Sequence, residues 1–336
     1  MVELGKALTQ PQEPPVKALF VYNSNPAAVA PNHNLVVRGL LRPDLFTVVH
    51  EQFLTDTTDY ADIVLPATTF FEHKDLQPAY GHYYLQISQP AIEPMGECRS
   101  NVETFRALAQ RLGFDEECFR EPVDAMIDAA LESPNPWLRG MDRHRLEREG
   151  QVRLNFAQDT PGSTEHEPFL PFAQGNFATA SGKAEFYSEQ LARQGLDPVA
   201  DFIPPQESRH SEQARQFPLE LLARKSDNFL NTTFANLPTL QKMEDPGALE
   251  MSAADASARG ISEGDRVRVF NRRGEAFLRA HVNGAVQPGT VSARLQWAKL
   301  SPGGASINVL TSERLTDMGG GPTFYSALVQ VERASG

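Results

Sequence analysis

The sequence predicts an α/β protein with two main parts, a parallel-sheet segment over residues 16–115 and a β-barrel domain over residues 216–336. In the first part, compact apolar runs alternate with a helical pattern, which is typical of βαβ units. In the last part, short strands follow one another closely around one small helix, which is typical of a closed barrel. We expect residues 1–15 to form a loose lead-in, and residues 116–215 to form an irregular connecting region that packs over the sheet.

Three apolar runs predict the strands of the sheet. They are VKALFVYN at residues 16–23, LFTVVHE at residues 45–51 and YADIVLPA at residues 60–67. Runs of this kind are typical of strands that are buried on both faces of a parallel sheet. Between the first two runs, NLVVRGLLR has helical spacing, with Leu35, Val36, Gly39 and Leu40 on one side.

Two amphipathic helices are predicted after these strands. The first is NVETFRALAQRLGF, with Gly113 as its stop. Its expected inward residues are Val102, Phe105, Leu108, Ala109 and Leu112. The second is PVDAMIDAALES, at residues 122–133.

The barrel is predicted from alternating apolar residues on either side of turns. In DRVRVFNRRGEAFLRAHV, Val267 and Val269 precede an Asn-Arg-Arg-Gly turn, and the alternation resumes after it. VQPGTVSARLQW adds a strand after a Pro-Gly turn. MSAADASARGIS predicts a short helix with Ser252 as N-cap, Asp255 in the capping-box position and Gly260 at its end.

Composition limits the classes of function. The chain has 336 residues and a formal net charge of -12, which argues against a general nucleic-acid or anionic-membrane partner. Cys98 and Cys118 are too few for a disulfide framework or an iron–sulfur cluster, and we expect them to be free and mostly buried. No run approaches the ~20 apolar residues of a membrane span. The start of the chain lacks the apolar stretch of a secretory signal, so we expect a cytoplasmic protein.

Several short motifs do not carry chemistry. His73, Lys74 and Asp75 are contiguous, so their side chains point in different directions. The eight histidines are scattered without the spacing of a zinc site. The glycine run at Met318–Pro322 lacks the Lys and Ser of a phosphate-binding loop, and no nucleophile–base pair is apparent.

Three loops rich in amide, hydroxyl and charged groups follow predicted strands. NSNP provides Asn23, Ser24 and Asn25, and HEQFLTDT provides Glu51, a carboxylate suited to the N1–H and N2–H of guanine. ARKSDNFLNTT provides groups suited to phosphates and to a polar heterocycle, namely Arg224, Lys225, Asn231 and Thr232. Each loop alone is more often a capped or solvated turn. Their order at the carboxyl ends of strands favours one shared ligand.

Several longer stretches resemble, in their amino-acid sequences and in their order along the chain, those of molybdopterin oxidoreductases of the dimethyl-sulfoxide-reductase type. This family includes formate dehydrogenases and nitrate reductases. The matching stretches include VKALFVYNSNPAAVAPN, LFTVVHEQFLTDTTDYADIVLPATTFFEHKDL, FATASGKAEFYSEQLARQGLDPV and GISEGDRVRVFNRRGEA. The resemblance covers essentially residues 16–333. It implies a Rossmann-like first segment and a dinucleotide-binding barrel of double-psi type.

In that family, two molybdopterin guanine dinucleotides hold one molybdenum or tungsten atom. The resemblance implies cofactor contacts from both parts of this chain. In the first part these are Asn23, Asn25, His50, Glu51, Lys74 and Asn101, the last standing where relatives often have Asp. In the barrel they are Arg224, Lys225, Asn231, Thr232, Trp297, Asn308 and Tyr325, the last standing where some relatives have Lys. No catalytic residue and no metal ligand is expected here.

The family's amino-terminal half, with its iron–sulfur cluster and metal ligand, has no counterpart in this sequence. We therefore expect the carboxyl-terminal, cofactor-binding portion of such an enzyme, not catalytic alone and without an iron–sulfur cluster of its own. A separate chain carrying the amino-terminal half is an expected partner, whereas the sequence does not identify an electron-transfer partner. The alternative is a non-catalytic nucleotide-binding or interaction module on the same scaffold. An independent hydrolase ranks last.

Overall fold

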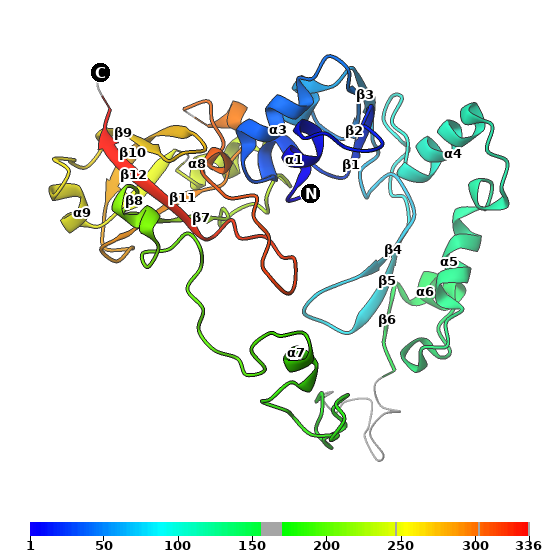
Figure 1. The fold of residues 1–336 in the computed structure, drawn as a ribbon. Coiled ribbons are helices and arrows are strands. Elements are labelled where there is room, and N and C mark those ends of the chain that lie inside the picture. Colours follow the sequence, from blue (N-terminus) through cyan, green and yellow to red (C-terminus); the bar gives the residue numbers. More distant parts are fainter. Residues whose placement is uncertain (156–169, 246, 302, 335–336) are drawn as a thin grey trace. The chain divides into compact units, whose positions relative to one another are not determined.

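The computed structural model describes residues 1–155, 170–245, 247–301 and 303–334. The chain divides into two compact units (Figure 1). One consists of Met1–Leu65 together with Ile203–Gly336, and the other is Pro66–Phe202. These divisions differ from the boundaries expected from the sequence, because residues 66–115 share a unit with the connecting region.

The first unit opens with a three-stranded sheet. Its strands are β1 (Ala18–Tyr22), β2 (Phe46–Glu51) and β3 (Ile63–Pro66), in the order β1-β2-β3. Strands β1 and β2 are parallel, with Tyr22 opposite His50 at their carboxyl ends. The predicted strands and the βαβ arrangement are confirmed.

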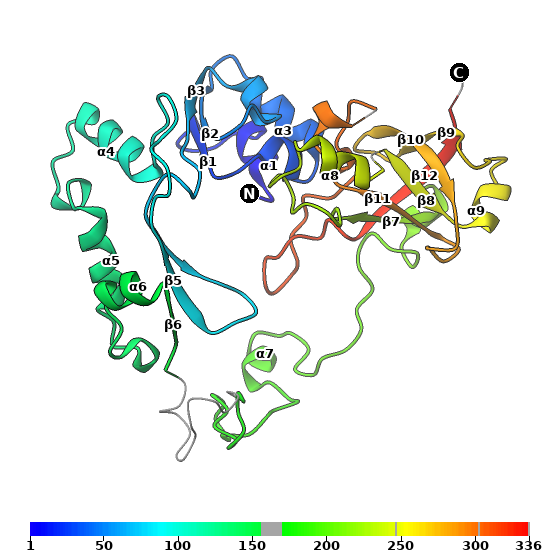
Figure 2. The same ribbon diagram turned by 180° about the vertical axis from the view of Figure 1, so that it is seen from behind.

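Short helices cover one side of this sheet. They are α1 (Leu4–Thr9), α2 (Pro26–Val29), α3 (His33–Leu40) and the 3₁₀ helix η1 (Thr57–Tyr60). Helices α1 and α3 lie against each other beside β1 and β2 (Figures 1 and 2). Leu8, Val36 and Leu40 form their shared core. The start of the chain is therefore not a loose lead-in throughout, because the apolar Leu4 and Leu8 of α1 bury against α3.

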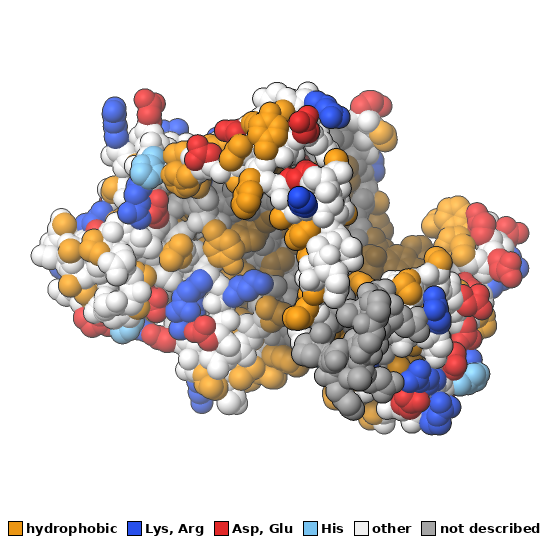
Figure 3. Space-filling view, turned by 90° about the horizontal axis from the view of Figure 1, so that it is seen from below, with side chains coloured by type: hydrophobic (Ala, Val, Ile, Leu, Met, Phe, Trp, Pro, Cys, Tyr) orange, Lys and Arg blue, Asp and Glu red, His pale blue; other side chains and the backbone are white. Residues whose placement is uncertain are grey.

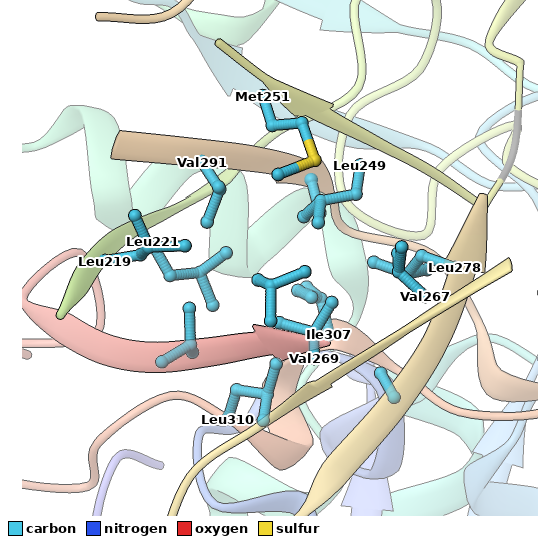
Figure 4. Close-up of a cluster of buried hydrophobic side chains, with 14 of the residues drawn as sticks. Leu219, Leu221, Leu249, Met251, Val267, Val269, Leu278, Val291, Ile307 and Leu310 are labelled. Atoms are coloured by element: carbon cyan, nitrogen blue, oxygen red, sulfur yellow. The ribbon is translucent and has the colours of Figure 1, made fainter. Parts of the chain in front are cut away.

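The rest of the first unit contains a closed barrel, as predicted, and this barrel has six strands. Its order is β10-β8-β11-β7-β12-β9, with parallel pairs β7/β11 and β8/β10 and antiparallel pairs elsewhere. The strands are β7 (Leu219–Arg224), β8 (Ala248–Met251), β9 (Arg266–Phe270), β10 (Glu275–Val282), β11 (Thr290–Arg294) and β12 (Ala327–Arg333). Alternate apolar side chains fill its interior, among them Leu221, Leu249, Val269 and Val291 (Figure 4).

Short helices connect the barrel strands. They are η4 (Glu212–Arg215), α8 (Pro238–Met243), α9 (Ala253–Ser257), η5 (Ala298–Leu300) and η6 (Ile307–Val309). The predicted cap of α9 is confirmed, since the Ser252 hydroxyl accepts from the Asp255 N–H at 3.1 Å. Helices η5 and η6 themselves contact the segment that carries the parallel sheet, through the hydrogen bonds described below.

The second unit contains an antiparallel sheet that the sequence did not predict. Its strands are β4 (Asp75–Pro78), β5 (Tyr84–Ser88) and β6 (Gln151–Arg153). The helices are α4 (Asn101–Leu112), η2 (Glu117–Phe119), α5 (Val123–Leu131), η3 (Pro136–Leu138), α6 (Arg143–Glu149) and α7 (Glu189–Arg193). Leu85, Ile127 and Leu146 share one core, so residues 116–153 form part of a packed unit.

Three burial predictions are wrong. The first strand was expected to be buried on both faces, but in β1 only Val21 is buried. Cys98 and Cys118 are free, as expected, but Cys98 is only partly buried and Cys118 is exposed. Helix α4 begins and ends as predicted, with Gly113 at a φ of 80°, yet Leu108 and Leu112 on its expected inward face are exposed. Amphipathic spacing identifies an apolar face, but not whether another element covers it.

Within the described residues, no helix is long and apolar enough to cross a membrane. Basic and acidic side chains lie among one another on the face shown in Figure 3.

The contact between α1 and α3 requires a glycine. A Cβ at Gly39 would lie 2.5 Å from the Leu8 Cβ. In an open helix, Gly→Ala is stabilising. Here Gly39→Ala is expected to lower the free energy of unfolding by about 1–3 kcal/mol because of overpacking. Chemical denaturation measures this change. The double variant with Leu8→Gly, which removes that Cβ, should be less destabilised than the sum of the two single variants, and simple additivity would contradict the packing argument.

Candidate functional site

A buried carboxylate joins the sheet loops to the barrel. Asp56, in the loop after β2, is 4% exposed. Its Oδ2 accepts from the Ala298 N–H at 2.7 Å and its Oδ1 accepts from the Lys299 N–H at 3.2 Å. Burial raises the pKa of Asp56, and these two N–H groups oppose that rise. We call the contacts between residues 25–60 and residues 297–311 the seam.

Lys299 reinforces the same side of the seam. Its Nζ donates to the Thr55 carbonyl at 2.8 Å and to the Leu54 carbonyl at 3.2 Å, and it pairs with Asp59 at 3.0 Å. One ammonium group therefore binds the loop after β2 at three points. That loop has little freedom to move away from the barrel.

Asn308 holds the other side of the seam. Its Nδ2 donates to the Ala28 carbonyl at 2.9 Å, and its Oδ1 accepts from the Thr311 hydroxyl at 2.8 Å. The Ser306 hydroxyl also donates to Ala28, at 3.2 Å. Both amide atoms of Asn308 are thus engaged within the chain. In this structure the residue positions α2 against η6.

Only one of the two polar side-chain atoms of Asn25 makes a hydrogen bond. Its Oδ1 accepts from the hydroxyl and the N–H of Thr57, at 2.6 and 3.2 Å. The side chain is 1% exposed, and its Nδ2 has no hydrogen-bond partner. The neighbouring Asn23 is exposed, with a φ of 50°. A buried donor remains at the point where β1 ends.

Trp297 is the first residue on the barrel side of the seam, and it is packed in an apolar cluster. It is 4% exposed and packs with Ala28, Phe229 and Ala235. Its indole Nε1 has no partner within the described chain. This apolar cluster brings the segment that carries Asn231 to the segment that carries Asn25. Asn231 has a φ of 53°, which amides tolerate better than most side chains.

Arg224 is committed to partners on the barrel. It donates to the Ser292 hydroxyl at 3.1 Å and pairs with Glu250 at 3.1 Å and with Asp227 at 3.2 Å. These contacts account for all three of its nitrogens. The structure therefore gives this predicted phosphate ligand a role in the barrel wall.

The other predicted residues of the first unit differ in exposure. His50 is 1% exposed at the end of β2. The next residue, Glu51, is partly buried, and burial raises the pKa of its carboxyl. Thr232 is partly buried, and Lys225 and Tyr325 are exposed.

Lys74 and Asn101 belong to the second unit. The Lys74 Nζ lies 2.7 Å from Asp124 and 2.9 Å from Glu147, so it is part of an ion-pair network. Asn101 is the first residue of α4, next to the Ser100–Glu103 capping box. The ion pairs account for the position of Lys74, and the start of α4 accounts for the position of Asn101.

Two cavities of the first unit lie away from the predicted residues. One, of about 380 Å³, is lined by His33, Asp56, Asp59, Tyr60, Ala298, Lys299, Ser301 and Gly304. The other, of about 180 Å³, lies beside Arg272, Arg273 and Arg314. Among the described residues, no group of three or more His, Cys, Asp or Glu side chains is arranged to hold a metal ion.

Sequence reasoning missed Gln296. It is 4% exposed, and neither its Nε2 nor its Oε1 has a hydrogen-bond partner among the described residues. The Thr55 hydroxyl is also buried and unpartnered. Gln296 lies between Leu295 and Trp297, just beyond the end of β11, rather than in a polar loop, so a search for polar loops passes over it.

Family models match the first third of the chain and the barrel. The model described as Molybdopterin oxidoreductase matches residues 2–111, and that described as Molydopterin dinucleotide binding domain matches residues 219–328. This chain belongs to the molybdopterin oxidoreductase family. The resemblance seen in the sequence is thereby confirmed.

Its relatives include long oxidoreductases. Probable oxidoreductase YoaE of Bacillus subtilis is 40% identical over 99% of this chain and 46% of the relative. Dimethyl sulfoxide reductase DmsA of Escherichia coli is 30% identical over 95% of this chain and 42% of the relative. The chain thus spans less than half the length of these curated relatives.

A solved structure shares the fold. Acetylene hydratase from Pelobacter acetylenicus aligns over 98% of this chain and 46% of its own, with a TM-score of 0.77 and 24% identity.

The unpartnered groups at the seam fit a molybdopterin dinucleotide. Asn25 Nδ2 and Trp297 Nε1 are donors, and Gln296 offers one donor and one acceptor. Pyrophosphate and heterocyclic carbonyl oxygens are acceptors. Buried polar groups are nearly always hydrogen-bonded in native proteins. A ligand rich in acceptors would supply the hydrogen bonds that these buried donors do not make within the described chain.

Removing one acceptor of Asp56 should loosen the seam. In Asp56→Asn, one of the two backbone donors faces an NH₂ group instead of an oxygen. We expect the free energy of unfolding to fall by about 1–3 kcal/mol, measured by denaturant titration. Asp59→Asn is the control, because the exposed pair with Lys299 is worth ~0–1 kcal/mol. Equal effects of the two variants would contradict a special role for Asp56.

The network around Lys74 predicts a dependence of stability on pH. Lys74 and Arg143 lower the pKa of Glu147 from 4.5 to about 2. Because the folded-state pKa lies below the unfolded one, ionised Glu147 stabilises the fold above pH 4.5. This contribution is lost as the pH falls towards 2. Stability measured across this window should therefore fall less steeply in Glu147→Gln, and likewise in Lys74→Met. An unchanged slope in both variants would contradict the assignment.

Proposed function

We propose that this chain is the carboxyl-terminal, cofactor-binding portion of a molybdenum or tungsten oxidoreductase that uses molybdopterin guanine dinucleotide. The observation that carries the proposal is the set of buried, unpartnered polar atoms at the seam, inside a chain of this family. We further propose that the sheet is a Rossmann-like segment and that the barrel is of double-psi type.

In this proposal, Asn25, Gln296 and Trp297 bind and orient the dinucleotide. Asp56, Lys299 and Asn308 fix the loops from which these side chains project. The bound metal would supply two-electron redox chemistry. The chain itself contributes binding, orientation and the exclusion of water from the buried seam.

We propose that the metal ligand and any iron–sulfur cluster lie on an amino-terminal half, which is part of the longer relatives. Apolar side chains of the sheet support a further packing partner. Tyr22, Phe46, Ile63 and Val64 are all at least 40% exposed, whereas parallel sheets are normally covered on both faces. Free cysteines fit a reducing compartment, so we place the protein in the cytoplasm.

A second candidate is a non-catalytic nucleotide-binding module on the same scaffold. The family resemblance assigns cofactor contacts to Arg224 and Asn308, but both side chains bind groups within this chain instead. This observation favours the second candidate. In this case the chain would bind a nucleotide without an amino-terminal partner.

The test is the cofactor content of the full chain purified from a molybdenum-supplied host, alone and co-expressed with the amino-terminal half of a relative. Mass spectrometry under native conditions should find guanylated pterin and a second polypeptide in the co-expressed sample. The absence of guanylated pterin from both samples would contradict the proposed function. A guanine nucleotide bound to the chain alone would favour the second candidate.

A further inference from the structure

Gln296, the residue immediately before the barrel side of the seam, is the buried side chain with the most unpartnered polar atoms among the described residues. It is 4% exposed, and both polar atoms of its amide lack hydrogen-bond partners among the described residues. A buried amide without partners is rare, because removal from water is not compensated. Such a group marks either an internal water site or a place where a ligand binds.

The barrel strand determines where this amide lies. Val291 and Ala293 of β11 belong to the barrel core, whereas the Ser292 hydroxyl accepts from Arg224. Side chains alternate along a strand, so continuing the period puts Gln296 on the outer side of the barrel wall with Ser292 and Arg294. Gln296 is therefore not part of the barrel's apolar interior.

Arg294 on this outer side binds the segment at the end of α8. Its guanidinium donates to the Glu244 carbonyl and lies 3.3 Å from the Glu244 carboxylate. Glu244 is fully buried, and its carboxylate also accepts from Asn228. This packing excludes water near β11. With little water nearby, the free-energy cost of leaving the Gln296 amide without hydrogen bonds is higher.

The seam begins immediately after Gln296. Trp297 packs with Ala28, and the next two N–H groups donate to Asp56. Gln296 is thus within two residues of the contacts that join barrel and sheet. The other unpartnered groups, Asn25 Nδ2, Thr55 Oγ1 and Trp297 Nε1, flank the same contacts.

We propose that Gln296 contacts the bound dinucleotide directly through its side-chain amide. This inference rests on the proposed function and adds a binding residue to it. A carboxamide presents a donor and an acceptor side by side, which matches the adjacent N–H and C=O of a cyclic lactam. The pterin and the guanine of the dinucleotide both contain that group. Gln296 therefore recognises a lactam edge, whereas Asn25 and Trp297 supply donors only.

The decisive variant is Gln296→Met in the full chain co-expressed with the amino-terminal half. Methionine has a similar volume and no amide. Without cofactor, in a host that makes none, the melting temperature should be unchanged or higher, since an uncompensated buried amide is removed. In a host that makes the cofactor, retained guanylated pterin should fall by about tenfold, which corresponds to a net loss of ~1.4 kcal/mol for the donor and acceptor contacts together.

Two matched variants accompany it. Trp297→Phe removes the indole N–H while keeping an aromatic ring against Ala28. Because phenylalanine fills less of this buried cluster, the melting temperature without cofactor should fall, and the retention of guanylated pterin should fall as well. Gln330→Met changes a partly buried glutamine of β12, whose amide oxygen accepts from the Val331 N–H at 3.0 Å. This control should retain as much cofactor as the wild type.

Two further arms distinguish the lactams. Reduced retention of unguanylated pterin by Gln296→Met, in a host that cannot attach guanosine, assigns the contact to the pterin. Reduced thermal protection by GDP assigns it to the guanine. Either result supports the inference.

Three outcomes overturn it. Retention equal to wild type in Gln296→Met would refute the contact and leave the proposed function intact. A lower melting temperature without cofactor would show that the amide is satisfied internally, for example by a buried water. Absence of cofactor from the wild-type protein would refute the proposed function together with this inference.

Discussion

The Asp56 carboxylate accepts hydrogen bonds from the consecutive peptide N–H groups of Ala298 and Lys299 in η5, and the rest of the site depends on this contact. A carboxylate with little solvent is unfavourable unless donors surround it. Because those donors belong to the barrel, the sheet loop and the barrel must meet in one register. Lys299 and Asn308 add contacts on either side, so the elements that carry Asn25 and Trp297 are held together.

The polar residues of the first unit fall into two groups with different roles. Arg224 and Asn308 have their hydrogen-bonding capacity used by neighbours within the chain. Gln296, Trp297 and Asn25 are each at most 4% exposed, yet each leaves a donor without a partner among the described residues. A preorganised site needs both kinds of residue, since the first holds the backbone and the second meets the ligand. Membership of the molybdopterin oxidoreductase family agrees with this division, because its cofactor is rich in acceptors.

Sequence patterns predicted many of the helices and strands well. They did not predict the short elements that depend on distant partners, or which polar side chains are hydrogen-bonded. Strand β1, helix α3 and the barrel strands β9, β10 and β11 follow from periodicity, which reports on the chain's own geometry. The barrel strands β7, β8 and β12 were not predicted individually. The helix at Leu4–Thr9 and the sheet β4-β5-β6 were missed because short elements gain stability from partners distant in sequence. For the same reason the patterns did not distinguish Asn308, whose amide is occupied, from Gln296, whose amide is open. Hydrogen-bond partners are a property of the folded structure.

The central claim is that the seam leaves donors for an acceptor-rich ligand, and the indole N–H of Trp297 reports on it most directly. The chain has two tryptophans, so a protein labelled with ¹⁵N-tryptophan gives two indole resonances, one from Trp297 and one from Trp137 of the other unit. Comparison of the cofactor-free and cofactor-loaded chain should show a downfield shift of the Trp297 N–H, with that of Trp137 unchanged. An indole resonance of Trp297 that is identical in both states would contradict the account.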